Sequence, residues 1–414
     1  MMNRERFSKH TLLMLAAAWL LASCAAPPTR PEGTQRGPNL SQTLASGTRA
    51  ITPHVPSDGS DDPTFANQKI VKVGLLLPLT GRNAELGRAL QDAATVSLFD
   101  KYARLSLRQQ TVRVELLPKD TGDTPEQAAR AAEQAVADGV EFIIGPLFAD
   151  ATSSAAPITR AKNISMLSLS NTRTQASPGT YMFGFSPAEQ ADRVVSYAIA
   201  SGKTRVAVLA PSGPLGDIVL SAARDAATRQ GFQLAAEARY LAQGAGIDSA
   251  LNSLVLAGKT PSFDAILIPE GGPTLDTLLR GLNSRGVKPT NIKFLGTGLW
   301  DDADLLRRVN LESAWVASSP PELTSQFDAR FRETYKYAPP RIASLTYDAV
   351  ALTVTLATSG RAFDAATLTN AGGFAGPANG IFRLRANGQV QRGLAVMQVT
   401  GGSLKVVSPA PSSF

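Results

Sequence analysis

The stretch KIVKVGLLLPLTGRNAELGRALQDAA at residues 69–94 decides the fold class, because it joins two elements of different periodicity. Its first half is a continuous apolar run that ends in Pro-Leu-Thr-Gly, which is typical of a strand buried on both faces and followed by a turn. Its second half begins a segment, from about Glu85 to Lys101, with apolar residues at helical spacing. A strand that leads through a polar turn into a helix is the unit of an α/β sheet.

The same unit recurs along the chain. TVRVELLPKD (111–120) and VEFIIGPL (140–147) predict strands, and TPEQAARAAEQAVADG (124–139) between them predicts a helix with a threonine cap and proline next to it. The order starts again after Phe185, with a helical pattern and then TRVAVLAPSG (204–213). Strands that alternate with helices predict an α/β fold of parallel sheets with helices on both faces. Because roughly 350 residues exceed one core of usual size, we expect two such lobes.

The N-terminus carries the pattern of an export signal. Arg4, Arg6 and Lys9 precede a short apolar run from Thr11 to Ala22. That run of about 12 residues is too short to span a membrane as a helix, which takes roughly 20.

Cys24 is the only cysteine of the chain and directly follows this signal. The sequence Leu21-Ala22-Ser23-Cys24 resembles the lipobox of bacterial lipoproteins, which implies removal of residues 1–23 and lipidation of Cys24. The alternative is ordinary secretory cleavage with a free thiol, which is a liability in an oxidising compartment. In a bacterium with two membranes, Ala25 after the cysteine implies anchoring at the outer membrane rather than retention at the inner one.

Residues 24–66 predict a tether between this anchor and the folded part. The segment is rich in Pro, Ser, Thr and Gly, and it lacks the apolar surface needed to offset its ordering entropy. It would average roughly 35 Å end to end as a coil, and it would reach about 130 Å at full extension.

Composition excludes several functions. Removal of Arg4, Glu5, Arg6 and Lys9 would leave 38 of the 41 basic and 33 of the 34 acidic side chains, a formal charge of +5. This mild excess, without a basic cluster among aromatic residues, argues against nucleic-acid binding. The two histidines, His10 and His54, fall in the signal and the tether, so histidine-based catalysis and metal sites are not expected in the folded part. We therefore predict a non-enzymatic protein without a cofactor or metal.

Two longer segments add a resemblance to these patterns. Together with residues 72–94, VEFIIGPLFADATSSAAPITRAKNISMLSLSNT (140–172) and GPANGIFRLRANGQVQRGLAVMQV (376–399) resemble the leucine/isoleucine/valine-binding proteins, the type I periplasmic binding fold. The resemblance implies two lobes joined by three crossings, near residues 183–186, 318–322 and 374–380. The lobes would comprise residues 67–184 with 320–374, and residues 185–319 with 375–414.

At the ligand-binding positions the sequence departs from the amino-acid binders. The resemblance places Ala149 where the family has a serine, Gly298 where it has an acidic residue for the ligand ammonium, and Leu86 where it has a covering aromatic residue. Ser170 and Thr172 fall at later contacts of the family. An ammonium enclosed without an anion would cost several kcal/mol, so an α-amino acid fits these positions poorly.

Other residues in the turns after strands offer alternatives. A carboxylate from a neighbouring turn could replace the missing charge, while Asp301 and Asp302 could equally cap a helix and Glu270 could be a solvated turn residue. Trp300 could stack on a ligand or a partner, or it could anchor the core. Backbone N–H groups near Ser212 could bind an anion at a helix start. The candidate cleft residues are thus Leu86, Ala149, Asp150, Ser170, Thr172, Ser212, Glu270, Gly298, Trp300 and Asp301.

Two functions remain, and both are non-enzymatic. One branch of the type I fold forms the penicillin-binding protein activators, outer-membrane lipoproteins that contact a peptidoglycan synthase, and FLGTGLWDD (294–302), the lipobox and the tether resemble that branch. The long helical N-terminal domain of some activators is missing from this chain. The alternative is a receptor that delivers an amino acid or a related small ligand to the permease of an ABC importer.

Overall fold

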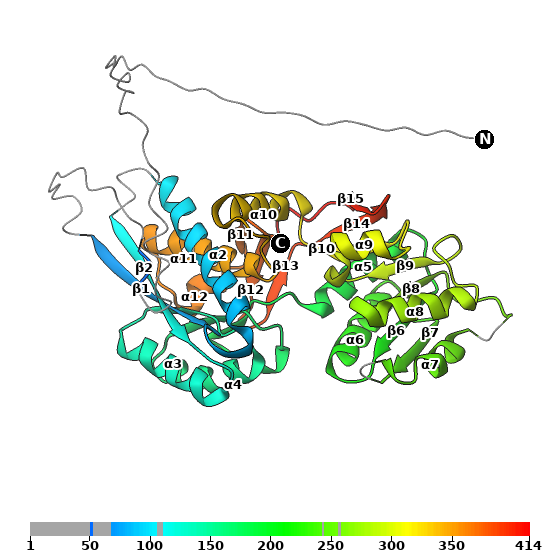
Figure 1. Cartoon of the computed structure of the whole chain (residues 1–414), viewed down its shortest axis with the longest axis horizontal. Helices are drawn as coiled ribbons and strands as arrows, with labels where there is room; N and C mark the ends of the chain where they lie inside the picture. The colour runs from blue at the N-terminus through cyan, green and yellow to red at the C-terminus, as the bar shows by residue number, and fades with distance from the viewer. Residues whose placement is uncertain (1–49, 53–67, 106–110, 242–243, 256–257) are drawn as a thin grey trace, which may run out of the picture. The chain divides into compact units, whose positions relative to one another are not determined.

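The structure is a computed structural model that describes residues 50–52, 68–105, 111–241, 244–255 and 258–414. Its strands form a five-stranded sheet, a seven-stranded sheet and a three-stranded sheet (Figure 1). We call the part built on the five-stranded sheet the first lobe and the part built on the seven-stranded sheet the second lobe. The predicted α/β class, with helices on both faces of two sheets, is confirmed.

The first lobe contains a fully parallel sheet in the order β2-β1-β3-β4-β5. Its central strands are buried on both faces, which explains the unbroken apolar run that begins the fold. The strands are β1 (Lys69–Leu77), β2 (Val112–Asp120), β3 (Phe142–Ile144), β4 (Ser165–Ser168) and β5 (Thr180–Met182).

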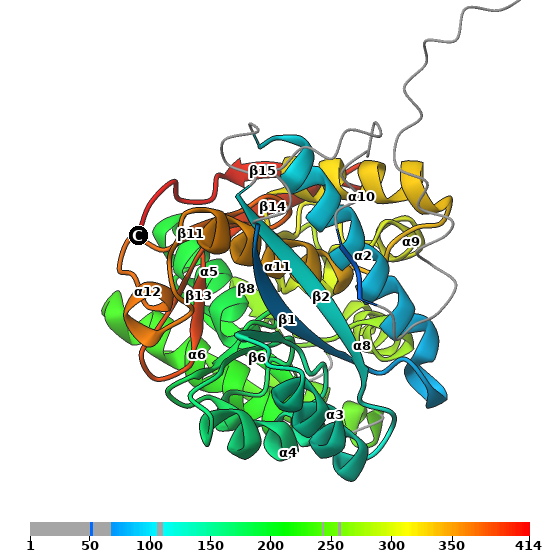
Figure 2. The same cartoon turned by 90° about the vertical axis from the view of Figure 1, so that its left-hand side faces the viewer.

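Alternation along β1 divides the first lobe into two layers. Val73, Leu75 and Leu77 belong to a cluster with α2 (Ala84–Ala103) and α11 (Ala343–Thr358), whereas Leu76 belongs to a smaller cluster on the opposite face. Figures 1 and 2 show the helices of this opposite face, α3 (Pro125–Ala137) and α4 (Ala149–Arg160), side by side. Helix α3 begins with a capping box between Thr124 and Gln127, as the sequence predicts.

The second lobe contains a mixed sheet in the order β15-β14-β10-β9-β8-β6-β7. The last two strands run antiparallel to their neighbours, so this sheet is not wholly parallel as predicted. Its strands are β6 (Val206–Pro211), β7 (Ala236–Tyr240), β8 (Ala265–Leu267), β9 (Lys293–Gly296), β10 (Trp315–Ser318), β14 (Ala395–Thr400) and β15 (Ser403–Ser408).

Helices cover both faces of this second sheet, and two separate apolar clusters fill the layers between. Helices α5 (Pro187–Ala200) and α6 (Pro214–Arg229) share one cluster. The other cluster contains residues of α7 (Ile247–Leu254), α8 (Gly272–Ser284) and α9 (Ala303–Arg308).

The chain crosses between the lobes three times. The first crossing lies between Met182 and Pro187, and the second lies between Ser318 and α10 (Pro321–Tyr335). The predicted third crossing near residues 374–380 is wrong. The chain stays in the first lobe through α12 (Ala365–Leu368), β11 (Phe374–Gly376), β12 (Gly380–Leu384) and β13 (Val390–Arg392).

The small three-stranded sheet explains this error. Phe382, Leu384 and Val390 pack into the main core cluster of the first lobe, so residues 375–392 do not belong to the second lobe. The third crossing falls between Arg392 and Ala395, where β14 joins the seven-stranded sheet. An alternating strand pattern indicates a half-buried strand but does not tell which core it covers.

The predicted tether also needs a correction. Ile51, within residues 24–66, is 2% exposed and pairs with Leu116 of β2 through hydrogen bonds of 2.8 and 3.0 Å. The folded part therefore includes Ile51, and a free tether would be confined to the residues before it. Cys24, His10 and His54 lie outside the described residues. No described helix is both long and apolar enough to cross a membrane.

Candidate functional site

The loop after β1 is held in place by Asp120 at the end of β2. The Asp120 carboxylate accepts hydrogen bonds from the Leu79 and Gly122 backbone N–H groups, each at 2.8 Å, and from the Thr80 hydroxyl. Burial alone would raise the pKa of Asp120, but these bonds outweigh it and hold the pKa below its usual value. The loop is thus fixed by the sheet, and Leu86 on α2 lies half-buried against the core of the first lobe.

The predicted contact residues after β3 and β4 take part in local hydrogen bonds. Ser170 is 6% exposed, and its hydroxyl oxygen accepts a bond of 3.2 Å from the Thr172 backbone N–H. Ala149 begins α4, and Asp150 next to it is exposed, with its side chain accepting from the Ala151 N–H at 2.8 Å. The side chains of Ser170 and Asp150 thus bond to nearby backbone groups. The predicted role of these residues as ligand contacts stays a prediction.

Glu270 joins two neighbouring loops of the second lobe. Its carboxylate accepts a bond of 2.6 Å from the Tyr240 hydroxyl, and its carbonyl oxygen accepts one of 2.8 Å from the Trp300 ring nitrogen. The Ser212 backbone N–H donates to the Tyr240 carbonyl oxygen at 2.7 Å. Glu270 is therefore a bonded turn residue rather than a solvated one.

Trp300 is fully buried and belongs to the second-lobe core, which contradicts the alternative of a stacking surface. Its ring lies against Gly296, where a Cβ atom would approach ring carbons to 2.2 Å. The sequence could not distinguish these alternatives, because an aromatic residue after a strand suits either role.

An acidic side chain at Gly298, the position where the amino-acid binders have one, would require Gln190 to shift. Its N–H donates to the Gln190 side-chain oxygen at 3.1 Å, and a Cβ atom would lie 2.8 Å from the Gln190 side-chain nitrogen. A carboxylate could not be added there without displacing Gln190, which is itself buried.

Asp301 forms a bridge between the lobes. Its Oδ2 accepts a bond of 2.6 Å from Arg341, which precedes α11 in the first lobe, and one of 2.8 Å from the Ser318 hydroxyl. Arg341 also donates to Ser318 at 2.5 Å, and its guanidinium lies 4.7 Å from the centre of the Phe185 ring. We call Asp301, Ser318 and Arg341 the interlobe bridge. Asp302, not Asp301, caps α9, by accepting from the Leu305 N–H at 2.8 Å.

The interlobe bridge changes what this region can bind. The charge of Asp301 is compensated by Arg341, with both side chains about one quarter exposed (24% and 25%). A ligand ammonium would compete with that guanidinium for the charge of the carboxylate. Asp301 therefore attracts an α-amino acid less than an unpaired carboxylate would.

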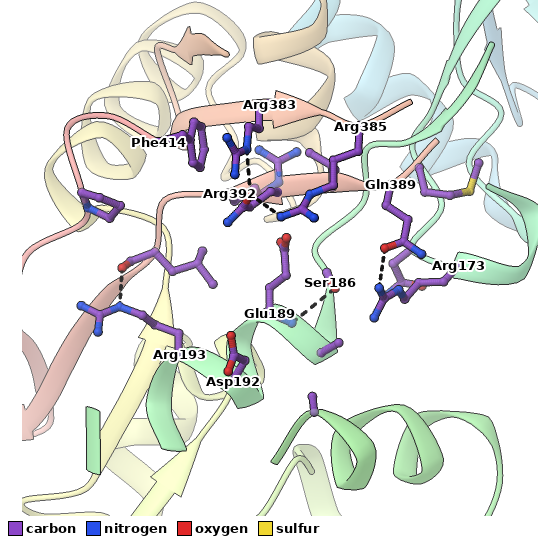
Figure 3. Close-up of a pocket in the computed structure, with 18 of the residues that line it drawn as sticks. Arg173, Ser186, Glu189, Asp192, Arg193, Arg383, Arg385, Gln389, Arg392 and Phe414 are labelled. Atoms are coloured by element: carbon purple, nitrogen blue, oxygen red, sulfur yellow. Dashed lines mark hydrogen bonds between the residues drawn. The ribbon is translucent and has the colours of Figure 1, made fainter. Parts of the chain in front are cut away.

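The structure contains a cavity of 710 Å³ that the sequence did not predict, lined by residues of the first and third crossings (Figure 3). None of the predicted cleft residues lines it. We call it the arginine cavity, because its lining includes Arg173, Arg193, Arg229, Arg383, Arg385 and Arg392. One sequence feature could have indicated this cavity, the segment RLRANGQVQR at 383–392. Its three arginines lie in and next to two paired strands. Within the described residues, no group of histidine, cysteine and carboxylate side chains is arranged to hold a metal ion.

Comparison with known sequences assigns most of the chain to one family. Residues 70–403 match the sequence model of a periplasmic binding protein family. The penicillin-binding protein activator LpoA of Pectobacterium parmentieri is 32% identical over 209 residues, which are 50% of this chain and 29% of that protein. The uncharacterized protein RP748 of Rickettsia prowazekii is 22% identical over 245 residues, 59% of this chain and 58% of that protein. The chain thus spans less than two thirds of the length of these relatives.

Solved structures with the same fold include transport proteins. A putative branched-chain amino acid ABC transporter protein of Rhodospirillum rubrum matches with a TM-score of 0.71 and 21% identity, over 82% of this chain and 100% of that one. The leucine binding protein LivK of Thermotoga maritima matches with a TM-score of 0.58 and 20% identity, over 82% and 98%. At these identities the likeness concerns the fold alone.

Proposed function

Because this chain belongs to the periplasmic binding protein family, we propose that it is a non-enzymatic periplasmic lipoprotein that regulates a peptidoglycan synthase. The observation that carries this proposal is the interlobe bridge, in which Arg341 already occupies the carboxylate of Asp301. A receptor for amino acids needs a free anion for the ligand ammonium, whereas a regulator that acts through its surface does not.

The sequence relatives support the same function. Two relatives, from Pectobacterium parmentieri and Photobacterium profundum, are named penicillin-binding protein activators, and they are 32% and 30% identical to this chain over parts of its length. The partner in this proposal is accordingly a penicillin-binding protein.

The N-terminal region supports attachment to a membrane by lipid. The signal pattern and the lipobox ending at Cys24 fit a lipoprotein, and Ala25 fits the outer membrane. Because Ile51 is fixed on β2, the free tether is at most the 26 residues from Ala25 to Ala50. Fully extended, it would reach roughly 90 Å, less than the 130 Å expected from the whole of residues 24–66. The folded part could still approach a synthase in the opposite membrane.

The alternative is a receptor of an amino-acid ABC importer, because two solved structures of this fold are named for branched-chain amino acid transport and leucine binding. Thermal unfolding of the protein with leucine, isoleucine, valine and their amides at millimolar concentration separates the two. We expect no stabilisation by these ligands, because Arg341 already compensates the charge of Asp301. A ligand present at 100 times its dissociation constant would stabilise the protein by about 2.7 kcal/mol, which is readily measured. Saturable stabilisation by one of these amino acids would replace the proposed function with transport.

A further inference from the structure

The arginine cavity lies where the lobes are connected. Its walls come from the first crossing with the start of α5, from the strands β12 and β13, and from the third crossing with the segment after β15. Arg173, Arg383 and Arg385 belong to the first lobe, whereas Arg193 and Glu189 lie on α5 of the second lobe (Figure 3). A molecule bound here would contact both lobes.

The cavity has an excess of positive charge. Its lining contains six arginines and three acidic side chains, Glu189, Asp192 and Asp225. Of the six, only Arg229 forms an ion pair within the part of the chain that the structure describes, and its partner is Asp192. A concave surface with an excess of one charge concentrates ligands of the opposite charge.

Arg173, Arg383 and Arg385 are held by neutral acceptors, which fix their positions without cancelling their charge. Arg383 and Arg385 both donate to the Gln391 side-chain oxygen, at 2.8 and 2.6 Å. Arg173 donates in the same way to Gln389. A guanidinium held in this manner keeps other N–H groups for a ligand, and its forked shape suits anionic oxygens.

Buried polar atoms at the cavity wall lack partners. Arg392 is 5% exposed, and its Nε and Nη1 have no hydrogen-bond acceptor. Its guanidinium lies 4.2 Å from the centre of the Phe183 ring, so it is fixed by packing. The Oε2 of Glu189, which points toward Arg392 and Arg385 in Figure 3, is also buried without a partner. Buried polar atoms without a partner are costly, and a water, an ion or a ligand group that reaches them lowers that cost.

The carboxyl of Glu189 also lines the cavity and faces the arginines. Burial raises its pKa to about 7, although Arg392 and the other arginines act in the opposite direction. Near pH 7 a large fraction of Glu189 is therefore protonated and uncharged, which weakens its repulsion of an anion.

We propose that the arginine cavity is the binding site of a small ligand with two or more anionic groups, held chiefly by Arg173, Arg383 and Arg385. Nothing in this proposal depends on a synthase partner. Carboxylate and phosphate groups both suit the guanidinium donors of the cavity. The experiment below distinguishes a carboxylate ligand from a phosphate ligand. Because Arg193 of the second lobe also lines the cavity, a ligand that reached it as well would link the two lobes.

Isothermal titration calorimetry of the full mature chain with citrate and with pyrophosphate tests this proposal. We expect saturable binding of at least one of them, with a stoichiometry near one. The double variant Arg383→Gln/Arg385→Gln should weaken that binding about tenfold or more, since each removed charge takes part in a charge-assisted hydrogen bond. Both side chains lie outside the apolar core, so the variant is expected to fold, as circular dichroism can verify.

The matched control is Arg307→Gln, which removes an exposed arginine of α9 far from the cavity in sequence and outside its lining. It should bind like the wild type. Binding of citrate alone would identify a carboxylate ligand, and binding of pyrophosphate alone would identify a phosphate ligand. Absence of saturable binding of either, or equal weakening by Arg307→Gln and by the double variant, would overturn the proposal.

Discussion

Replacement of Trp300 by alanine is expected to lower the free energy of unfolding by about 3–5 kcal/mol. The side chain is fully buried in the second-lobe core, and its ring nitrogen donates to the Glu270 carbonyl oxygen. The substitution would open a large cavity beside Gly296 and leave that carbonyl without its donor. Urea unfolding followed by circular dichroism measures the change.

Leu299 provides a matched control, because it is the preceding residue but is 51% exposed. Leu299→Ala should lower the free energy of unfolding much less. If Trp300→Ala left stability unchanged and affected only the binding of a ligand or partner, the assignment of Trp300 to the core would be wrong.

Asp348→Ala is the second substitution with a large expected effect, a loss of about 3–5 kcal/mol in the free energy of unfolding. Asp348 on α11 is fully buried and accepts bonds from the Ala378 N–H at 2.8 Å and from the Asn379 N–H and side chain at 3.1 and 2.9 Å. Burial raises its pKa to about 6, so the group is ionised at pH 7.5. Alanine would leave three donors unsatisfied and remove an anion near Arg392.

The control for this substitution is Asp364→Ala. Asp364 also accepts a backbone bond, from the Thr367 N–H at 2.7 Å, but it is exposed to solvent at the start of α12. We expect a much smaller change in the unfolding midpoint at pH 7.5. Equal effects of the two substitutions would contradict the account of Asp348 as the residue that holds the turn at Ala378 and Asn379.

The fold could be predicted because each unit of the chain repeats a local pattern. The buried run of β1 and the capped start of α3 are signals contained within a few residues, and both are confirmed. The errors concern contacts between distant residues. Ile51 looks like part of a polar tether until it pairs with Leu116, and the alternation of β12 does not indicate which core Phe382 enters.

The candidate site was harder to predict from the sequence for the same reason. The resemblance to the amino-acid binders revealed the departures at Ala149 and Gly298. The ion pair between Arg341 and Asp301 could not be predicted, because the two residues lie 40 residues apart and Arg341 lies in a segment without periodicity. The arginine cavity likewise joins Arg173 to Gln389, which are 216 residues apart. Only the tertiary structure brings these side chains together.

The most direct test of the proposed function is the rate of peptide cross-linking by purified penicillin-binding proteins of the same bacterium, measured with and without this protein. Heat-unfolded protein serves as the control. The account predicts that the folded protein raises the rate of at least one synthase in a saturable manner, while the unfolded protein does not. If no penicillin-binding protein of that bacterium responds, the proposal that this protein regulates a peptidoglycan synthase is contradicted.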